Sequence, residues 1–258
     1  MRPAPSGETM DYRQRLFDSY YTTHFARFAK SDPEQVRLLH EVYDRTFGPF
    51  LPRDPEASIL DVGCGTGSML LFLKKKGFRR VSGVDVSPQQ VERSRACGPF
   101  QVEVSEGRSY LEGHPGAFDM IFALDIFEHL RKEDVLPMLD AVRSSLRPGG
   151  RLAIATVNGA GLTAGRLLYG DFTHELAYTE ASLRQLFAAT GLETVRVLPG
   201  LPVELWTGFR GWIRKAIWRA FDLLAHLYLH ATTSSGILHS DHILSDGIFA
   251  VAEKPLPR

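Results

Sequence analysis

Three glycines at alternate positions follow a short apolar run that contains one acid. The run is 59–62, its acid is Asp61, and the glycines are Gly63, Gly65 and Gly67. Glycine allows a sharp backbone turn and the close approach of a ligand, and the helix-like run that follows offers unpaired N–H groups at its start. The spacing is GxGxG rather than the GxGxxG of dinucleotide-binding turns, and Asp61 would repel a pyrophosphate. These residues therefore predict a turn that holds a cationic ligand.

Acidic residues also follow the next apolar runs. Asp85 comes after the second run, Glu106 and Gly107 come after the third, and Leu124 and Asp125 come at the end of the fourth. Ligands of open parallel sheets bind outside the carboxyl ends of the strands. A carboxylate at Asp85 can accept both hydroxyls of a ribose, and Glu106 can accept from an adenine amino group. The alternatives are a helix cap for Asp85 and solvated surface for Glu106.

Three side chains on later segments could accept a proton from a hydroxyl nucleophile: His129, His174 and Asp171. His129 ends the set Asp125-x-x-Glu128-His129, and the other two lie in a long loop after the fifth predicted strand. The alternative for His129 is a packed, hydrogen-bonded histidine, and for His174 it is a loop anchor. The residues alone do not decide between the catalytic and the structural role, either for His129 or for His174.

The pattern of strands and helices must place these groups together. From Ser58 onward the two alternate, which is typical of an α/β fold with a parallel sheet and helices on both faces. Strands are expected at 58–62, 80–84, 100–104, 118–124, 150–156, 193–198 and 246–253. Helices are expected between them at 67–76, 88–96, 131–146 and 179–190.

Two further helices are expected before the first strand, at 11–30 and from Pro33 to about Gly48. They are predicted to form a cap over the carboxyl edge of the sheet, where Tyr20 and Tyr21 either close over a ligand or pack in the core. Two long excursions, 157–178 and 199–245, are of a length that carries substrate contacts or a lid.

One structural domain is expected, in four segments. They are a leader and helical cap (1–56), the ligand-binding core (57–198), a helical insertion or lid (199–245), and a final strand and tail (246–258). With 258 residues, 44% of them hydrophobic, the chain can bury a full core.

Composition limits the partners and the compartment. Thirty basic residues balance thirty acidic ones, which argues against nucleic acid as a partner. Two cysteines, Cys64 and Cys97, suggest neither a disulfide framework nor a zinc site, and Cys64 is expected to be a small packing residue. The absence of an apolar signal core and of any run of about 18 uncharged apolar residues predicts a cytoplasmic protein.

The segment 209–228 reads as a basic amphipathic helix. It could lie peripherally on a membrane near a lipid-linked acceptor. Packing against its own sheet, against the leading helices or across a homodimer interface is the favoured alternative.

Taken together, these motifs resemble those of class I S-adenosylmethionine-dependent methyltransferases. The similar stretches are 59–68, 81–87, 105–107, 118–130 and 146–157, so the resemblance covers about 57–198. It implies a Rossmann-like seven-stranded sheet whose last strand is antiparallel, a transferase activity and S-adenosyl-L-methionine as cofactor. The cofactor-binding residues that it implies are Asp61, Gly63, Gly65, Gly67, Asp85, Glu106, Gly107, Leu124 and Asp125.

The acceptor is less sharply indicated. The segment 171–187 resembles one in methyltransferases of bacterial glycan assembly, so O-methylation of a sugar hydroxyl in a glycan or lipid-linked precursor is the favoured prediction. Asp125, Glu128 and His129 resemble the acidic-acidic-His cluster of ubiquinone-type O-methyltransferases, which implies a divalent metal and an aromatic or quinone-like acceptor. Capping and cofactor packing are favoured over a metal for this cluster, so no metal ligand is assigned. A non-catalytic S-adenosylmethionine-binding scaffold is the remaining alternative.

Overall fold

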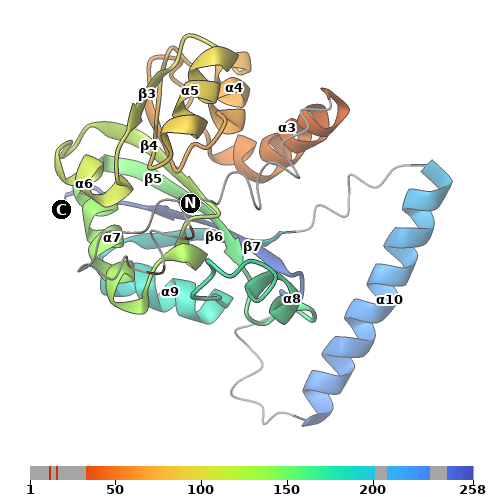
Figure 1. The fold of residues 1–258 in the computed structure, drawn as a ribbon. Helices are drawn as coiled ribbons and strands as arrows, with labels where there is room; N and C mark the ends of the chain where they lie inside the picture. Colours follow the sequence, from red (N-terminus) through yellow and green to blue (C-terminus); the bar gives the residue numbers. More distant parts are fainter. Residues whose placement is uncertain (1–11, 13–15, 17–32, 201–207, 233–242, 258) are drawn as a thin grey trace, which may run out of the picture.

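The computed structural model describes residues 12, 16, 33–200, 208–232 and 243–257. Its seven-stranded sheet has the order β3-β2-β1-β4-β5-β7-β6 (Figure 1). The strands are β1 Ser58–Val62, β2 Arg80–Asp85, β3 Gln101–Val104, β4 Phe118–Leu124, β5 Leu146–Val157, β6 Glu193–Pro199 and β7 Gly247–Glu253. β7 pairs antiparallel with both β5 and β6, and the remaining pairs are parallel. The predicted Rossmann-like α/β sheet with an antiparallel last strand is confirmed.

Helices cover both faces of this sheet, as the alternating pattern predicted (Figure 1). They are α3 Pro33–Phe47, α4 Ser68–Lys75, α5 Pro88–Cys97, α6 Gly107–Glu112, α7 Lys132–Ser145, α8 Ala164–Leu168, α9 Glu180–Ala189 and α10 Gly208–Thr232, with 3-10 turns η2 Gly48–Phe50 and η3 Phe127–His129. The predicted helix at 11–30, with Tyr20 and Tyr21, lies outside the described residues apart from 12 and 16.

Two apolar layers hold these helices on the sheet. On one face Leu139 of α7 and Phe187 of α9 pack with Leu60 of β1. On the other, Leu70 of α4 and Phe122 of β4 share a layer. Strands buried on both faces read as nearly continuous apolar runs, which is why β1 and β4 were recognisable.

The helix before the first strand packs beside α4. Phe47, at the end of α3, sits edge-on against Phe122 of β4 and Phe249 of β7, with ring centroids 5.5 and 5.4 Å apart. Tyr43, one turn earlier, contacts Phe72 of α4. The observed N-terminal helix thus anchors the sheet face that leads up to the glycine turn.

β5 begins earlier than predicted. It starts at Leu146, which pairs with Phe118, and the register then shifts so that Arg151 pairs with Met120. The Pro148-Gly149 turn is therefore an irregularity inside the strand and not its boundary, with Gly149 at a φ of 75°. The short elements α6, α8 and η3 were not predicted, because a few residues are too short to show a helical period.

Candidate functional site

The glycine turn joins the end of β1 to the start of α4. Gly63, Gly65 and Gly67 have φ angles of 69°, 52° and 84°, a region that side chains with a Cβ rarely adopt. The backbone N–H groups of Gly63 and Cys64 both donate to the carbonyl of Val84, at 2.8 and 3.0 Å. The turn is therefore fixed against the carboxyl end of β2.

Packing also requires the glycines. A Cβ on Gly63 would lie 2.0 Å from Cδ1 of Ile126, and one on Gly67 would lie 2.5 Å from Oγ of Ser94. Both distances are shorter than any real contact. Cys64 packs against Gly83 of β2, and burial raises the pKa of its thiol, which fits the predicted packing role.

Asp85 ties the turn to the next helix. Its Oδ2 accepts from the N–H of Gly65 at 2.9 Å, and its Oδ1 accepts from the N–H of Ser87 at 2.8 Å. Burial raises the pKa of Asp85, and these two backbone hydrogen bonds oppose that rise. The cap of α5 is Ser87, whose hydroxyl accepts from the N–H of Gln90, so the alternative role of helix cap belongs to Ser87. Each Asp85 oxygen keeps a second lone pair for a further donor.

Acidic groups gather at this edge of the sheet. Asp61 is 3% exposed, and burial together with the charge of Asp85 raises its pKa well above the usual range. Burial, then the charges of Asp61 and Asp125, raise the pKa of Tyr43, which places the α3 hydroxyl at the same edge. A cationic ligand would relieve this repulsion between carboxylates.

Asp125 adopts a left-handed backbone directly after β4. Its φ is 55°, a conformation that no other non-glycine among the described residues shares. Its N–H donates to the carbonyl of Ala155 at 2.9 Å. Burial of its carboxyl raises its pKa to about 6, although the residue as a whole is exposed. Such backbone strain costs on the order of 1–3 kcal/mol and is concentrated at functional sites.

Glu106 and Gly107 form the start of α6. Glu106 caps α6, accepting from the N–H of Arg108 at 3.0 Å and from the N–H and hydroxyl of Ser109 at 2.7 and 2.8 Å. Burial pushes the pKa of Glu106 upward, but these hydrogen bonds outweigh it and lower the pKa. A Cβ on Gly107 would lie 2.6 Å from Val62, so this glycine lets α6 start against β1. An adenine contact of Glu106 stays a prediction.

His129 belongs to a hydrogen-bonded chain with two residues of the loop after β5. Its Nδ1 lies 2.9 Å from Oγ1 of Thr173, and that hydroxyl donates to Oδ1 of Asp171 at 2.7 Å. Nδ1 also lies 3.3 Å from the carbonyl of Thr173, which can only accept. Both contacts require the proton on Nδ1, so the neutral ring carries its lone pair on Nε2. The structure thus brings His129 and Asp171 together, with Thr173 between them.

His174 stands beside this chain without a bond to His129. The two rings meet edge-on, with centroids 4.7 Å apart. Its Nδ1 donates to the carbonyl of Leu167 at 2.9 Å, and its Nε2 lies 4.0 Å from Oδ2 of Asp171. The bond to Leu167 gives His174 the loop-anchoring role that the sequence left open, and a catalytic role for it stays a prediction.

Glu128 is buried against β5. Its carboxyl is 2% exposed and accepts from the hydroxyl of Thr156 on β5 at 3.0 Å. Burial, then the charge of Asp125, raise its pKa to about 8. The described part of the chain holds no group of three or more His, Cys, Asp or Glu side chains arranged to bind a metal ion.

Two polar residues that the patterns did not indicate support this loop. Asn158 is fully buried, and its amide donates to the carbonyls of Ile243 and Ser245, both at 2.7 Å. Tyr178 donates through its hydroxyl to the carbonyl of Phe127 at 2.9 Å, within the turn that ends at His129. Asn158 directly follows β5, so the rule that selected Asp85 could have found it.

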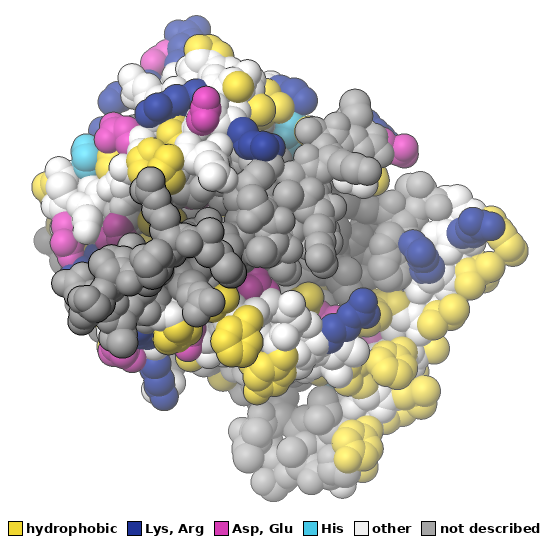
Figure 2. All heavy atoms as spheres, viewed as in Figure 1, with side chains coloured by type: hydrophobic (Ala, Val, Ile, Leu, Met, Phe, Trp, Pro, Cys, Tyr) yellow, Lys and Arg dark blue, Asp and Glu magenta, His cyan; other side chains and the backbone are white. Residues whose placement is uncertain are grey.

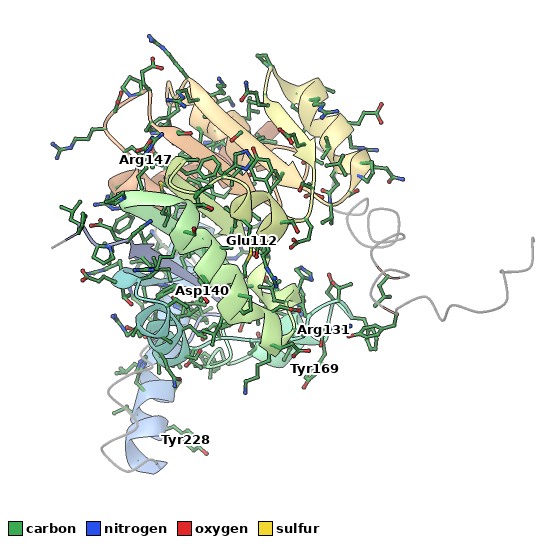
Figure 3. The ribbon with its side chains drawn as sticks, turned by 90° about the vertical axis from the view of Figure 1, so that its left-hand side faces the viewer. Glu112, Arg131, Asp140, Arg147, Tyr169 and Tyr228 are labelled. Carbon is green, nitrogen blue, oxygen red and sulfur yellow. The ribbon has the colours of Figure 1, made fainter. Side chains whose placement is uncertain are left out.

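Two aromatic side chains of this loop are exposed. Tyr169 and Phe172 are 83% and 81% exposed. Figure 3 shows Tyr169 at the surface, on the same side of the molecule as Arg131, the residue just before α7. Both rings are therefore open to contact from outside the loop.

Comparison with known proteins points to one family. A family model described as a methyltransferase domain matches residues 28–197. A ubiquinone biosynthesis O-methyltransferase from Xylella fastidiosa (strain 9a5c) is 31% identical over 109 residues, which are 40% of this chain and 42% of that protein. A ribosomal protein L11 methyltransferase from Paraburkholderia phytofirmans is 34% identical over 104 residues, 40% of this chain and 33% of that protein. The chain thus matches less than half the length of either relative.

The fold has close counterparts among solved structures. The crystal structure of a SAM-dependent methyltransferase from Archaeoglobus fulgidus superposes with a TM-score of 0.63 at 18% identity, covering 95% of this chain and 100% of that one. At this identity the likeness concerns the fold.

Proposed function

This chain belongs to the methyltransferase domain family, and from that premise we propose that it transfers the methyl group of S-adenosylmethionine to a hydroxyl oxygen. The favoured acceptor is a sugar hydroxyl in a glycan or a lipid-linked precursor. The favoured setting is the cytoplasm, at or near a membrane surface, with no nucleic acid as partner.

The acidic edge around the glycine turn supports the choice of cofactor. Bound S-adenosylmethionine supplies a methyl group on a positively charged sulfur. Asp61 offers a buried carboxyl beside the turn, and a cation bound there would favour its ionised form. Asp85 has lone pairs left for the ribose hydroxyls. The left-handed glycines leave the turn without side chains, so its backbone can approach a ligand closely. The residues present therefore fit this cofactor.

The hydrogen-bonded chain from His129 to Asp171 supports transfer to a hydroxyl. With its proton on Nδ1, neutral His129 can take the acceptor's proton on Nε2. The positive charge that then forms on the ring is stabilised through Thr173 by the carboxylate of Asp171. The arrangement is similar to that of hydrolytic triads, in which a carboxylate orients the histidine that acts as the base. The His129–Thr173 bond is the single observation that carries the proposal of O-methylation.

Two surface features favour a glycan over a small planar molecule. Tyr169 and Phe172 present rings whose faces can cover the C–H surface of a sugar ring. The long helix α10 carries exposed apolar side chains, which suits an acceptor held on a lipid.

Radiolabelled methyl transfer tests the proposal. The full chain is incubated with labelled S-adenosylmethionine and, in parallel, with a lysate of the source organism, sugar acceptors and catechol-like acceptors. We expect alkali-stable label in a carbohydrate or lipid-extractable glycan fraction. Label on protein or RNA alone would overturn the acceptor class, and cofactor binding with no label on any acceptor would favour the scaffold alternative.

A second candidate, an aromatic or quinone-like acceptor, is favoured by the similarity to the Xylella protein named above. Its metal-assisted form is less consistent with Glu128, whose carboxyl bonds to Thr156. Loss of activity in EDTA together with loss in Glu128→Ala, restored by Mg²⁺ only in the wild type, would support it over the sugar acceptor.

A further inference from the structure

α10 presents a broad apolar surface that the rest of the described chain does not cover. The helix spans 25 residues and stands apart from the sheet and its covering helices (Figure 1). Large apolar side chains on it are 38% to 78% exposed: Phe209, Trp212, Ile213, Ile217, Phe221, Leu223, Leu224, Leu227 and Tyr228. Figure 2 shows apolar side chains running along the outer side of α10. The predicted packing of this segment on its own sheet is therefore not supported.

The spacing of these residues makes one continuous face. Positions 209, 213, 216, 220, 224 and 227 recur at three- and four-residue steps, so they share one side of the helix. Trp212 and Leu223 extend this side in one direction, and Ile217 and Phe221 extend it in the other. The result is about half of the circumference, far wider than the narrow seam of a coiled coil.

Charge on the helix has one dominant sign. Arg210, Arg214, Lys215 and Arg219 are opposed by one acid, Asp222, although the whole chain has a formal net charge of +0. The basic groups lie in the first half of the helix, beside Trp212 and Ile213. Figure 2 shows Lys and Arg side chains near one end of α10. A partner that covers the apolar face therefore meets a positive rim.

We propose that α10 lies flat on an anionic membrane, with its apolar face in the headgroup and upper acyl region and its basic residues against lipid phosphates. A wide apolar face, aromatic residues and a cationic border are the features of interfacial helices. No helix among the described residues is long and apolar enough to cross a bilayer. At 1.5 Å per residue α10 is about 37 Å long, enough to rest on the surface along its whole length. This inference rests on the proposed function in one respect: the membrane is where a lipid-linked acceptor would be found.

Vesicle sedimentation and tryptophan fluorescence test it with the full chain. All three tryptophans lie within 206–218, so a blue shift of emission reports on α10 and its approach. We expect the protein to sediment with phosphatidylcholine vesicles containing phosphatidylglycerol at low salt, to sediment much less with phosphatidylcholine alone, and to be released by high salt. Brominated acyl chains should quench the emission on binding.

Paired variants locate the contact. Ile217→Asp with Leu224→Asp should weaken vesicle binding at least tenfold, and Arg214→Glu with Lys215→Glu should remove the dependence on anionic lipid. Leu136→Asp is the matched control, because Leu136 is 43% exposed on α7, a helix that lies away from α10 (Figure 1). It should bind vesicles as the wild type does. Calorimetry with S-adenosylmethionine should give the same affinity for all variants. A loss of vesicle binding with unchanged cofactor affinity is then due to α10 and not to damage at the proposed active site.

Three outcomes would overturn the inference. One is a wild-type chain that stays in the supernatant with anionic vesicles at low salt. Another is a chain whose binding is unchanged by the apolar-face variant. The third is a dimer in sedimentation velocity that the Ile217→Asp, Leu224→Asp variant dissociates without any vesicle binding, which would assign the face to a second copy.

Discussion

The Thr173 hydroxyl lies 2.9 Å from Nδ1 of His129 and joins two segments that are far apart in the sequence. Because the same hydroxyl donates to Asp171, it fixes both the tautomer and the orientation of the imidazole. A loop residue thus sets which ring nitrogen of His129 carries the lone pair.

Replacing Thr173 by Val should keep the size of the side chain and remove this relay. We expect kcat to fall roughly 10- to 100-fold, because a misoriented base loses most of a catalytic contribution of about 10²- to 10⁴-fold. The affinity for S-adenosylmethionine should not change. Thr173→Ser restores the hydroxyl and should restore most of kcat and the wild-type pH profile. Equal loss in both variants would indicate a packing role instead.

His129→Ala should abolish most turnover without loss of cofactor binding. The expected fall in kcat is about 10²- to 10⁴-fold if His129 is the general base. His114→Ala is the control, since His114 is exposed at the end of α6 and bonds to the carbonyl of Tyr110. Single-turnover rates at saturating cofactor give the measurement. Full activity in His129→Ala would remove this residue from the mechanism.

Asp85→Asn tests the assignment of the ribose contact. The amide has one acceptor oxygen in place of two, so we expect the Kd for S-adenosylmethionine to rise roughly 10- to 100-fold by calorimetry. Asp140→Asn is the control, because Asp140 is an exposed acid on α7 (Figure 3). A variant that melts like the wild type and binds the cofactor equally well would contradict the assignment. NAD, titrated in parallel, should show no binding.

Gly63→Ala should destabilise the fold through a clash, beyond the cost of the backbone angle. Its Cβ would meet Ile126 at 2.0 Å, whereas a Cβ on Gly77, whose φ is 96°, would meet nothing within 4 Å. Gly77→Ala therefore measures strain alone, on the order of 1–3 kcal/mol. Urea unfolding should show a larger loss for Gly63→Ala, partly recovered in Gly63→Ala with Ile126→Ala. Equal losses at the two glycines would show that the clash is relieved without cost.

Glu128 makes stability depend on pH. Its pKa is raised from 4.5 to about 8 in the folded state, so between these values the folded chain holds a proton that the unfolded chain has lost. Stability from this group is therefore full below about pH 4.5 and falls as pH rises toward 8, by up to about 1.4 kcal/mol per pH unit. Glu128→Gln should flatten the urea-unfolding profile across that range. A wild-type profile that rises with pH relative to the variant would contradict the assignment.

The sequence indicated the sheet well, because buried parallel strands are continuous apolar runs and their carboxyl ends share one edge. That rule placed Asp85 and Asp125 at this edge, and Asp61, the last residue but one of β1, lies there too. It could not assign Glu106 to a cap or to a ligand, because both roles need the same carboxylate. Thr173 was not found, because its role depends on how the loop after β5 folds back onto η3, a contact between distant segments with no periodic signal. The exposure of α10 could not be predicted either, because an amphipathic pattern indicates an apolar face but not what packs against it.

The order of the strands in the sheet has a consequence for synthesis. β7 lies between β5 and β6 but follows both in the chain. Among the strands that the structure describes, β6 pairs with β7 alone. A nascent chain emerging from the ribosome has therefore completed α10 while β6 still lacks its partner. During that interval an unpaired strand edge and an exposed apolar helix coexist, which is the state most open to aggregation or to chaperones. A bilayer that captured α10 at this point would shield the apolar helix until residues 247–253 close the sheet.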